Sequence, residues 1–233
     1  MSQLVNYACE HKIARITLDD GKVNALSPQM IAEINSALDQ AEADGAVVVL
    51  TGRPGIFSAG FDLKILKQGN AQTLGMLQAG FELAARLLEH RTPVLIACPG
   101  HAMAMGAFLT LSADYRIGIS GDFNYQANEV AIGLTMPRAA IAICRQRLTA
   151  AHFERAVVLA EAFDPEGALK AGFLDQVVAP EALFDAAMAR AAQLTSLDMR
   201  AHAETKRRAR EATLQAIRQG NEADIREHTQ RGM

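Results

Sequence analysis

Glu129 is a lone carboxylate in an otherwise apolar run of residues. Val130, Ala131 and Ile132 follow it directly, and Gly133 closes the run. Burying a carboxylate is costly unless the group is paired or protonated, so this position needs an explanation. Judged by residue types alone, the pattern favours a solvent-facing glutamate at the end of a strand.

A second candidate for chemistry is the turn that follows a short apolar run at residues 46–50. Residues 53–63 read Arg-Pro-Gly-Ile-Phe-Ser-Ala-Gly-Phe-Asp-Leu. Small residues in a turn let a ligand approach the backbone closely, and free N–H groups at the start of a helix attract an anion. The residue types alone still favour a plain strand-to-helix turn over a binding loop.

A third segment extends from Pro99 to Asp114. No formally charged residue occurs from Thr92 to Ala113, which is long enough for a membrane span. Pro93, Pro99 and Gly100 interrupt this stretch, so we expect a strand, a turn and a buried helix instead. The lone His101 in the turn is expected to be a hydrogen-bonded core residue.

The elements around these segments predict an α/β protein. Short β-branched or alternating runs bounded by turn residues indicate strands, and apolar residues at helical spacing indicate helices. Strands alternating with helices are typical of βαβ units with a largely parallel sheet. From about residue 137 the pattern is nearly all helical, apart from an extended run at 174–178. The predicted strands are 12–18, 46–50, 94–98 and 115–119, and the predicted helices begin near 28, 74 and 105.

Composition excludes several classes of protein. Half of the 233 residues are hydrophobic and the formal net charge is −3, so a large core can form and no basic field exists for nucleic acid or anionic membranes. Cys9, Cys98 and Cys144 are too few for a disulfide framework and match no zinc spacing, which fits a reducing, cytoplasmic compartment. No His/Asp/Glu cluster, Ser-His-Asp set or glycine-rich phosphate loop is evident, so we expect neither a metal nor a cofactor.

The motif Phe-Ser-Ala-Gly-x-Asp-Leu, preceded by Arg-Pro-Gly, resembles the oxyanion loop of the crotonase (enoyl-CoA hydratase/isomerase) superfamily. The likeness extends over about residues 12–180 and is greatest to the mitochondrial-type 3,2-enoyl-CoA isomerases. It implies that the backbone N–H groups of Ala59 and Met105 hold the thioester oxygen, and that Glu129 is the catalytic residue. The family usually has glycine where this chain has Met105.

The resemblance also implies a reaction. Family hydratases carry a further glutamate in the buried helix, and the two carboxylates position a water molecule, but Phe108 stands here. A single base can instead move a proton along an acyl chain, so we expect double-bond isomerisation from the 3- to the 2-position of an enoyl-CoA in fatty acid metabolism. The alternatives are a hydratase that works with Glu129 alone and a catalytically weak acyl-CoA-binding protein of the same fold.

The implied fold is the crotonase spiral of repeated ββα turns, with residues 1–180 as its core and residues 181–233 as a helical region for trimerisation. We therefore expect a homotrimer or a dimer of trimers, with CoA entering only as part of the substrate. Lys206 could meet the CoA 3′-phosphate, although a solvated helix face is the simpler interpretation. The expected substrate-binding residues are Lys22, Val23, Ala25, Gly60, Asp62, Leu63, Gly106, Phe108 and Ile132.

Overall fold

The protein is described by a computed structural model that covers residues 3–230. Two sheets form its centre. The larger has the spatial order β1 (Val5–Glu10), β2 (Ile13–Leu18), β3 (Val47–Thr51), β5 (Val94–Cys98), β7 (Tyr115–Ile119) and β9 (Gln176–Val178). The smaller contains β4 (Gly55–Ser58), β6 (Gly100–Met103) and β8 (Tyr125–Gln126). Among the paired strands within residues 3–230, β1 and β2 are antiparallel and every other pair is parallel.

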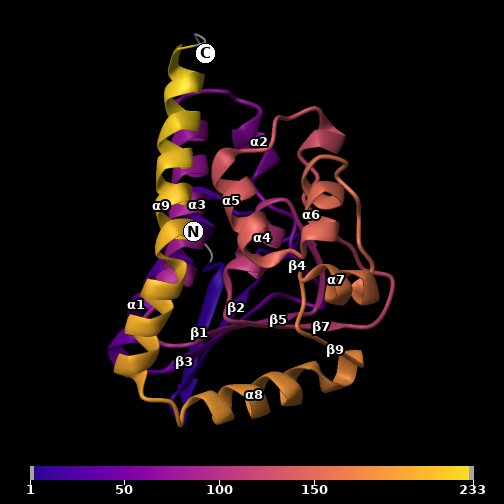
Figure 1. Cartoon of the computed structure of the whole chain (residues 1–233). Coiled ribbons are helices and arrows are strands. Elements are labelled where there is room, and N and C mark those ends of the chain that lie inside the picture. Colours follow the sequence, from indigo (N-terminus) through magenta and orange to yellow (C-terminus); the bar gives the residue numbers. More distant parts are fainter. Residues whose placement is uncertain (1–2, 231–233) are drawn as a thin grey trace.

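Nine α-helices and two short 3₁₀ turns are assigned within residues 3–230, and they surround the two sheets (Figure 1). The long helix α9 stands upright along one side of the molecule, next to α3, and α8 runs beneath the strands. The helices are α1 (Pro28–Asp44), α2 (Leu63–Leu66), α3 (Ala71–Glu89), α4 (Met105–Ser112), α5 (Arg138–Arg147), α6 (Ala150–Val157), α7 (Pro165–Ala171), α8 (Leu183–Leu194) and α9 (Met199–Gln230), with the 3₁₀ turns η1 (Val130–Ile132) and η2 (Pro180–Ala182).

The central strands β3, β5 and β7 of the larger sheet are buried on both faces, as their apolar sequences predict. In β5, Val94, Ile96 and Cys98 point into the main core with α1 and α3, whereas Leu95 and Ala97 point into a second cluster with α8. Successive side chains of a strand alternate between faces, so a fully apolar strand needs cover on both sides. Burial on both faces explains why these strands show no polar alternation.

Two helix starts carry local capping signals, and the helix predicted from near residue 74 begins at Ala71. Ser27 caps α1, where its side-chain oxygen accepts a hydrogen bond from the N–H of Met30 and Pro28 occupies the first turn. Asp164 caps α7 in the same way, with Pro165 next to it. The uncharged stretch that begins at Thr92 forms β5, β6 and the fully buried α4. None of the helices within residues 3–230 combines the length and apolar character needed to cross a bilayer.

The smaller sheet was missing from the sequence prediction. Its three strands have only two to four residues each, and Pro99-Gly100 at the start of β6 reads as a strand breaker. The parallel pairs β4–β6 and β6–β8 bring together segments that are far apart along the chain. Short strands of this kind are stabilised by their partners and by burial, so local sequence patterns do not reveal them.

Candidate active site

All three candidate motifs lie at one edge of the smaller sheet. The 59–62 loop follows β4, the turn into α4 follows β6, and the Glu129 segment follows β8. The carboxyl ends of parallel strands lie at the same edge of a sheet, and this edge is where ligands commonly bind in α/β proteins. A hydrogen bond of 2.9 Å from the Ala104 N–H to the Gln126 carbonyl ties the last two segments together.

The first two loops touch at Gly60. A Cβ atom at this position would lie 2.7 Å from the Cβ of Ala104 and 3.2 Å from the backbone nitrogen of Met105. Gly60 also has a φ of +91°, which side-chain-bearing residues rarely adopt. Glycine at position 60 is therefore required for the two loops to meet.

The predicted donor in the first loop is wrong, because the Ala59 N–H is already used. It donates a hydrogen bond of 3.0 Å to the Val23 carbonyl. Leu26 pairs with the same loop: its N–H donates to Gly60 O at 2.8 Å and its carbonyl accepts from the Asp62 N–H at 3.5 Å. In such a parallel pairing the residue between the two partners points its N–H away, and that residue is Phe61.

Phe61 therefore supplies the open donor of this loop. Its N–H has no hydrogen-bond partner among residues 3–230, and it is one peptide away from Gly60, which touches the Met105 turn. Residue types alone do not reveal Phe61 as the donor, because its free amide depends on the pairing of this loop with residues 23–26. The only local signal was the Gly-x-Asp spacing after the small residues.

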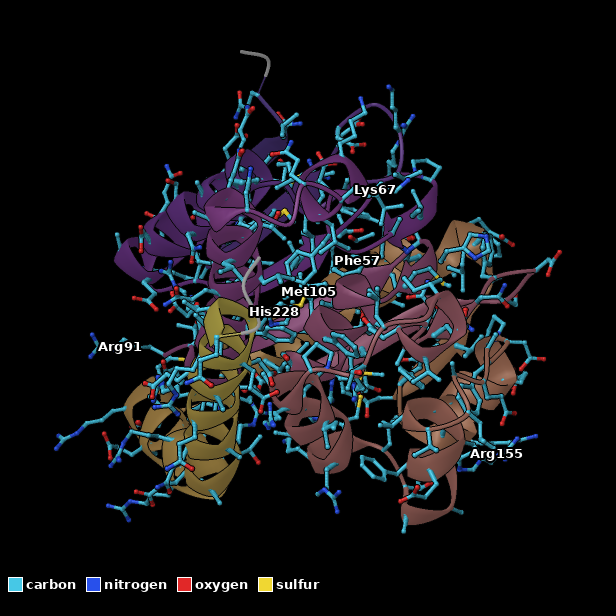
Figure 2. The ribbon with its side chains drawn as sticks, turned by 90° about the horizontal axis from the view of Figure 1, so that it is seen from above. Phe57, Lys67, Arg91, Met105, Arg155 and His228 are labelled. Atoms are coloured by element: carbon cyan, nitrogen blue, oxygen red, sulfur yellow. The ribbon has the colours of Figure 1, made fainter. Side chains whose placement is uncertain are left out.

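Met105 is well placed for the second donor. It is the first residue of α4, and the first helical hydrogen bond runs from the Phe108 N–H to Ala104 O. The N–H groups before Phe108 therefore have no helical partner, as at any helix start. The methionine side chain is fully buried in the main core, so the departure from glycine is accommodated. Figure 2 labels Met105 and Phe57, and both side chains belong to the main core.

Three phenylalanines pack behind the two loops. The ring of Phe61 meets the ring of Phe81 edge-on at 6.1 Å, and Phe81 is stacked on Phe108 at 6.3 Å. Phe108 is 1% exposed. The position where family hydratases carry a second carboxylate is thus filled by the buried ring of Phe108, which is stacked on Phe81.

Glu129 is buried and not at a solvent-facing strand end, the interpretation that its residue type alone favoured. It is 8% exposed, and its Oε2 has no hydrogen-bond partner in the described part of the chain. Burial raises the pKa of Glu129 to about 7, since the charged form is poorly solvated there. Its charge in turn adds to the burial that raises the pKa of the Cys144 thiol on α5, so this thiol is a close neighbour.

The structure places the other predicted binding residues in different surroundings. Gly106 is packed tightly, since a Cβ there would lie 2.5 Å from the Ser58 carbonyl oxygen. The carboxylate of Asp62 caps α2, accepting a hydrogen bond of 2.8 Å from the Lys64 N–H. Exposed or half-buried side chains border the loops at Lys22, Val23, Ala25, Leu63 and Ile132.

Lys206 fits neither interpretation proposed from the sequence. It is buried, and its Nζ forms a 2.6 Å ion pair with Asp114. The same carboxylate binds Arg210 at 2.8 Å. Lys206 therefore fastens α9 to the core and is neither a phosphate ligand nor part of a solvated face. His101 is hydrogen-bonded as expected, since its Nδ1 accepts a bond of 3.0 Å from the Asn124 N–H, but it is half-buried and not a core residue.

No group of three or more His, Cys, Asp or Glu side chains within residues 3–230 is arranged to hold a metal ion. The site combines a buried carboxyl, two open backbone amides and an apolar wall. Such a set can move a proton at a carbon atom while binding the adjacent carbonyl oxygen.

Comparisons with known proteins identify relatives of this chain. The chain is 30% identical to human mitochondrial enoyl-CoA delta isomerase 1, and the match covers 91% of this chain and 72% of the human protein. It is 33% identical to the probable enoyl-CoA hydratase EchA17 of Mycobacterium avium, over 76% of this chain and 70% of that one. A crystal structure of a Mycobacterium tuberculosis enoyl-CoA isomerase superimposes with a TM-score of 0.93 at 46% identity, covering 97% of this chain and 99% of that one. Another crystal structure of the same protein is described as a probable enoyl-CoA hydratase.

Residues 8–232 match the sequence profile of the enoyl-CoA hydratase/isomerase family. With the spiral fold and the relatives described above, this match shows that the chain belongs to the enoyl-CoA hydratase/isomerase family of the crotonase superfamily.

Proposed function

We propose that this protein moves a double bond from the 3- to the 2-position of an enoyl-CoA thioester. The observation that carries the proposal is the solitary buried carboxyl of Glu129, whose pKa is raised to about 7, in a chain where Phe108 stands at the position of the hydratases' second carboxylate. A base with a pKa near the working pH can both take up and return a proton efficiently.

In the proposed reaction, the Glu129 carboxylate removes a proton from the carbon α to the thioester carbonyl. The electron pair of the broken C–H bond spreads over the double bond and the carbonyl, which gives a dienolate. The carboxylic acid then returns the same proton to the γ carbon, and the double bond becomes conjugated with the carbonyl. No water is consumed and no atom is lost.

The N–H groups of Phe61 and Met105 are the proposed donors to the dienolate oxygen. They belong to touching loops, and both lack other partners within residues 3–230. Donors fixed in place before the charge develops are worth roughly 3–4 kcal/mol of barrier each. Phe61 replaces Ala59 in this role because the Ala59 N–H is bound to Val23.

A hydratase is the second candidate, because several relatives carry that name. Hydration requires a water molecule to be held and split, usually between two polar groups. Here the ring of Phe108 packs on Phe81, which in turn contacts Phe61. The ring of Phe108 cannot form a hydrogen bond with a water molecule. The aromatic cluster therefore favours isomerisation over hydration.

The decisive experiment compares wild-type protein with Glu129→Gln on 3-enoyl-CoA and 2-enoyl-CoA substrates, with product identification by mass spectrometry. We expect wild-type protein to isomerise 3-enoyl-CoA, and we expect the variant to lose about a thousandfold or more in kcat because its amide cannot accept the proton. Affinity for a saturated acyl-CoA should stay within about threefold of wild type, since the shape of the side chain is kept.

Two other outcomes would favour the alternative functions. Water addition at a rate comparable to isomerisation would favour the hydratase. Tight CoA-ester binding without any turnover would favour a binding protein. The homotrimer stays a prediction from the family resemblance, and the cytoplasmic location stays a prediction from the small number of cysteines.

A further inference from the structure

Ser58 is the last residue of β4 and directly precedes the 59–62 loop of the proposed site. It is fully buried, and its hydroxyl forms two hydrogen bonds. The hydroxyl donates to the Asn24 carbonyl at 2.7 Å, and its Oγ accepts from the Gly60 N–H at 3.2 Å. This one side chain therefore links the loop to the segment of residues 23–26.

The same segment also binds the loop on both sides of this link. The Ala59 N–H donates to the Val23 carbonyl at 3.0 Å. The Gly60 carbonyl accepts from the Leu26 N–H at 2.8 Å. Three successive peptide groups of the loop are thus fixed against residues 23–26, the first and the third directly and the middle one through the Ser58 hydroxyl.

The middle peptide group determines how the open amide of the loop is held. It carries the Gly60 N–H, and the next peptide group carries the Gly60 carbonyl and the Phe61 N–H. The N–H and the C=O of a trans peptide point in opposite directions, so the orientation of this plane sets the direction of the Phe61 N–H. Without the Ser58 hydroxyl the middle peptide group can rotate, and the plane that follows it is less firmly fixed.

Asn24 gives the link a rigid anchor. It is fully buried and has a φ of +51°, a conformation that asparagine adopts more readily than most residues. Its side-chain amide donates to the carbonyls of Leu18 at 3.1 Å and Phe57 at 3.0 Å. Its Oδ1 accepts from the Asp20 N–H at 3.1 Å. The carbonyl that receives the Ser58 bond is therefore held in place by its own residue's contacts.

Ser58 also contacts the turn of the second proposed donor. A Cβ at Gly106, the residue after Met105, would lie 2.8 Å from the Cβ of Ser58. We propose that Ser58 is a positioning residue of the oxyanion site, which orients the open amide of the 59–62 loop through its two hydrogen bonds, with Asn24 as the anchor. The proposal rests on the proposed function.

The test removes the hydroxyl. Ser58→Ala leaves the Asn24 carbonyl and the Gly60 N–H unbound. We expect kcat for 3-hexenoyl-CoA to fall by about tenfold or more while KM stays within about threefold, because a displaced donor matters most when charge develops on the oxygen. Ser58→Cys keeps a weak donor and acceptor and should restore part of the lost kcat. The same variant tests the role if Ser58→Ala fails to fold.

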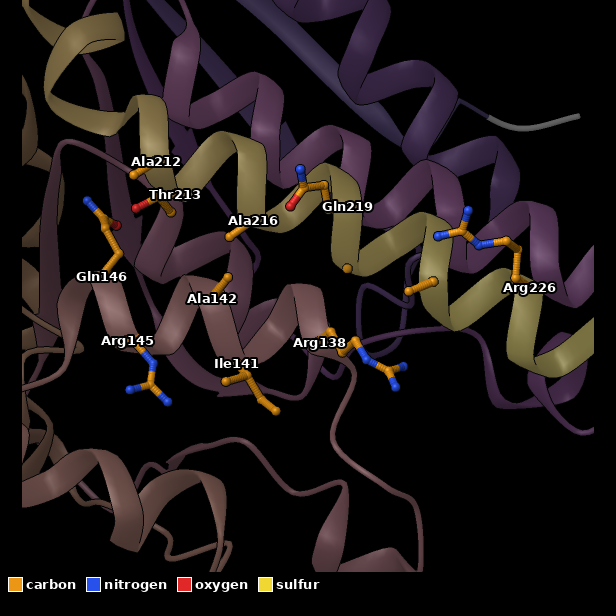
Figure 3. A pocket seen from close by; sticks show the side chains of 12 residues that line it. Arg138, Ile141, Ala142, Arg145, Gln146, Ala212, Thr213, Ala216, Gln219 and Arg226 are labelled. Carbon is orange, nitrogen blue, oxygen red and sulfur yellow. The ribbon is translucent and has the colours of Figure 1, made fainter.

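Two hydroxyl groups outside this network give matched controls. Ser112 is also fully buried, and its hydroxyl donates to the Phe108 carbonyl within α4 at 2.8 Å. Thr213 lines an open groove of about 950 Å³, whose lining residues all belong to α5 and α9 (Figure 3). Ser112→Ala and Thr213→Val should each keep kcat within about threefold of wild type.

A binding measurement separates the positioning role from the proposed reaction. Acetoacetyl-CoA can bind as its enolate, which absorbs in the near ultraviolet and carries negative charge on oxygen as the dienolate does. We expect Ser58→Ala to lower the ratio of bound enolate to bound keto form by about tenfold, and to keep the affinity for butyryl-CoA within about threefold.

The outcomes are distinct. If the wild type forms the enolate without isomerising 3-enoyl-CoA, and Ser58→Ala loses the enolate, the positioning role stands and the reaction is wrong. Equal enolate ratios for Ser58→Ala and Ser112→Ala would overturn the role of Ser58. A wild-type protein that binds acetoacetyl-CoA in the keto form alone would overturn it as well.

Discussion

At the scale of single residues, the proposed chemistry depends on the environment of one carboxyl group, that of Glu129. Burial raises the pKa of Glu129 to about 7, and a backbone hydrogen bond of the same residue offsets only part of that shift. A base works in its ionised form, which predominates above the pKa. We therefore expect kcat/KM for a 3-enoyl-CoA to be level above about pH 7 and to fall about tenfold per pH unit below it. A profile that stays level down to pH 5 would show that a different group takes the proton.

Gly80 is a second residue on which the site depends, although it lies outside the catalytic loops. A Cβ at this position of α3 would lie 2.4 Å from a ring carbon of Phe61. Gly80→Ala should therefore push the Phe61 ring outward and displace its backbone N–H, with a loss of about tenfold or more in kcat. Overpacking of this kind also costs about 1–3 kcal/mol of stability, measurable by urea unfolding.

The same helix offers a control for Gly80. A Cβ at Gly75 would meet no atom within 4 Å, so Gly75→Ala should stabilise the protein by about 0.5–1 kcal/mol and keep full activity. The smaller side chain of Phe61→Leu should restore part of the activity of Gly80→Ala. Equal activities for the two alanine variants would mean that α3 does not position the loop.

At the scale of secondary-structure elements, α9 depends on buried charges. Asp114 accepts ion pairs from Lys206 and Arg210 and a hydrogen bond of 2.7 Å from the Val94 N–H. Asp114→Asn would leave two buried cations without their counter-charge, which should cost about 3–5 kcal/mol in urea unfolding. On the same helix, Glu204→Gln removes only the exposed pair with Arg207 and should change stability by less than about 1 kcal/mol. A small effect for both variants would mean that α9 docks by apolar contacts alone.

At the scale of the whole molecule, the family resemblance predicts self-association. The single chain exposes large apolar side chains at Val158, Leu159 and Phe184, and Leu159 is 70% exposed. Light scattering should give a mass close to three or six times 25.0 kDa. A mass of one chain at all concentrations would contradict the expected trimer or dimer of trimers.

The sequence by itself determined the fold class, the main strands and the capped helix starts, because apolar alternation, Ser27-Pro28 and Asp164-Pro165 are local signals. It also singled out Glu129 and Phe108 through family motifs. It did not determine the small sheet of β4, β6 and β8, whose strands are too short to leave a pattern and exist only through their pairing.

Only the tertiary structure decided which backbone amide is open and where Lys206 lies. The Ala59 N–H donates a hydrogen bond to the Val23 carbonyl. The Phe61 N–H is left open, since Leu26 pairs with the residues on both sides of Phe61. Lys206 is buried because α9 returns along the core to meet Asp114. Residues far apart in sequence make both contacts, so no local pattern of residue types encodes them.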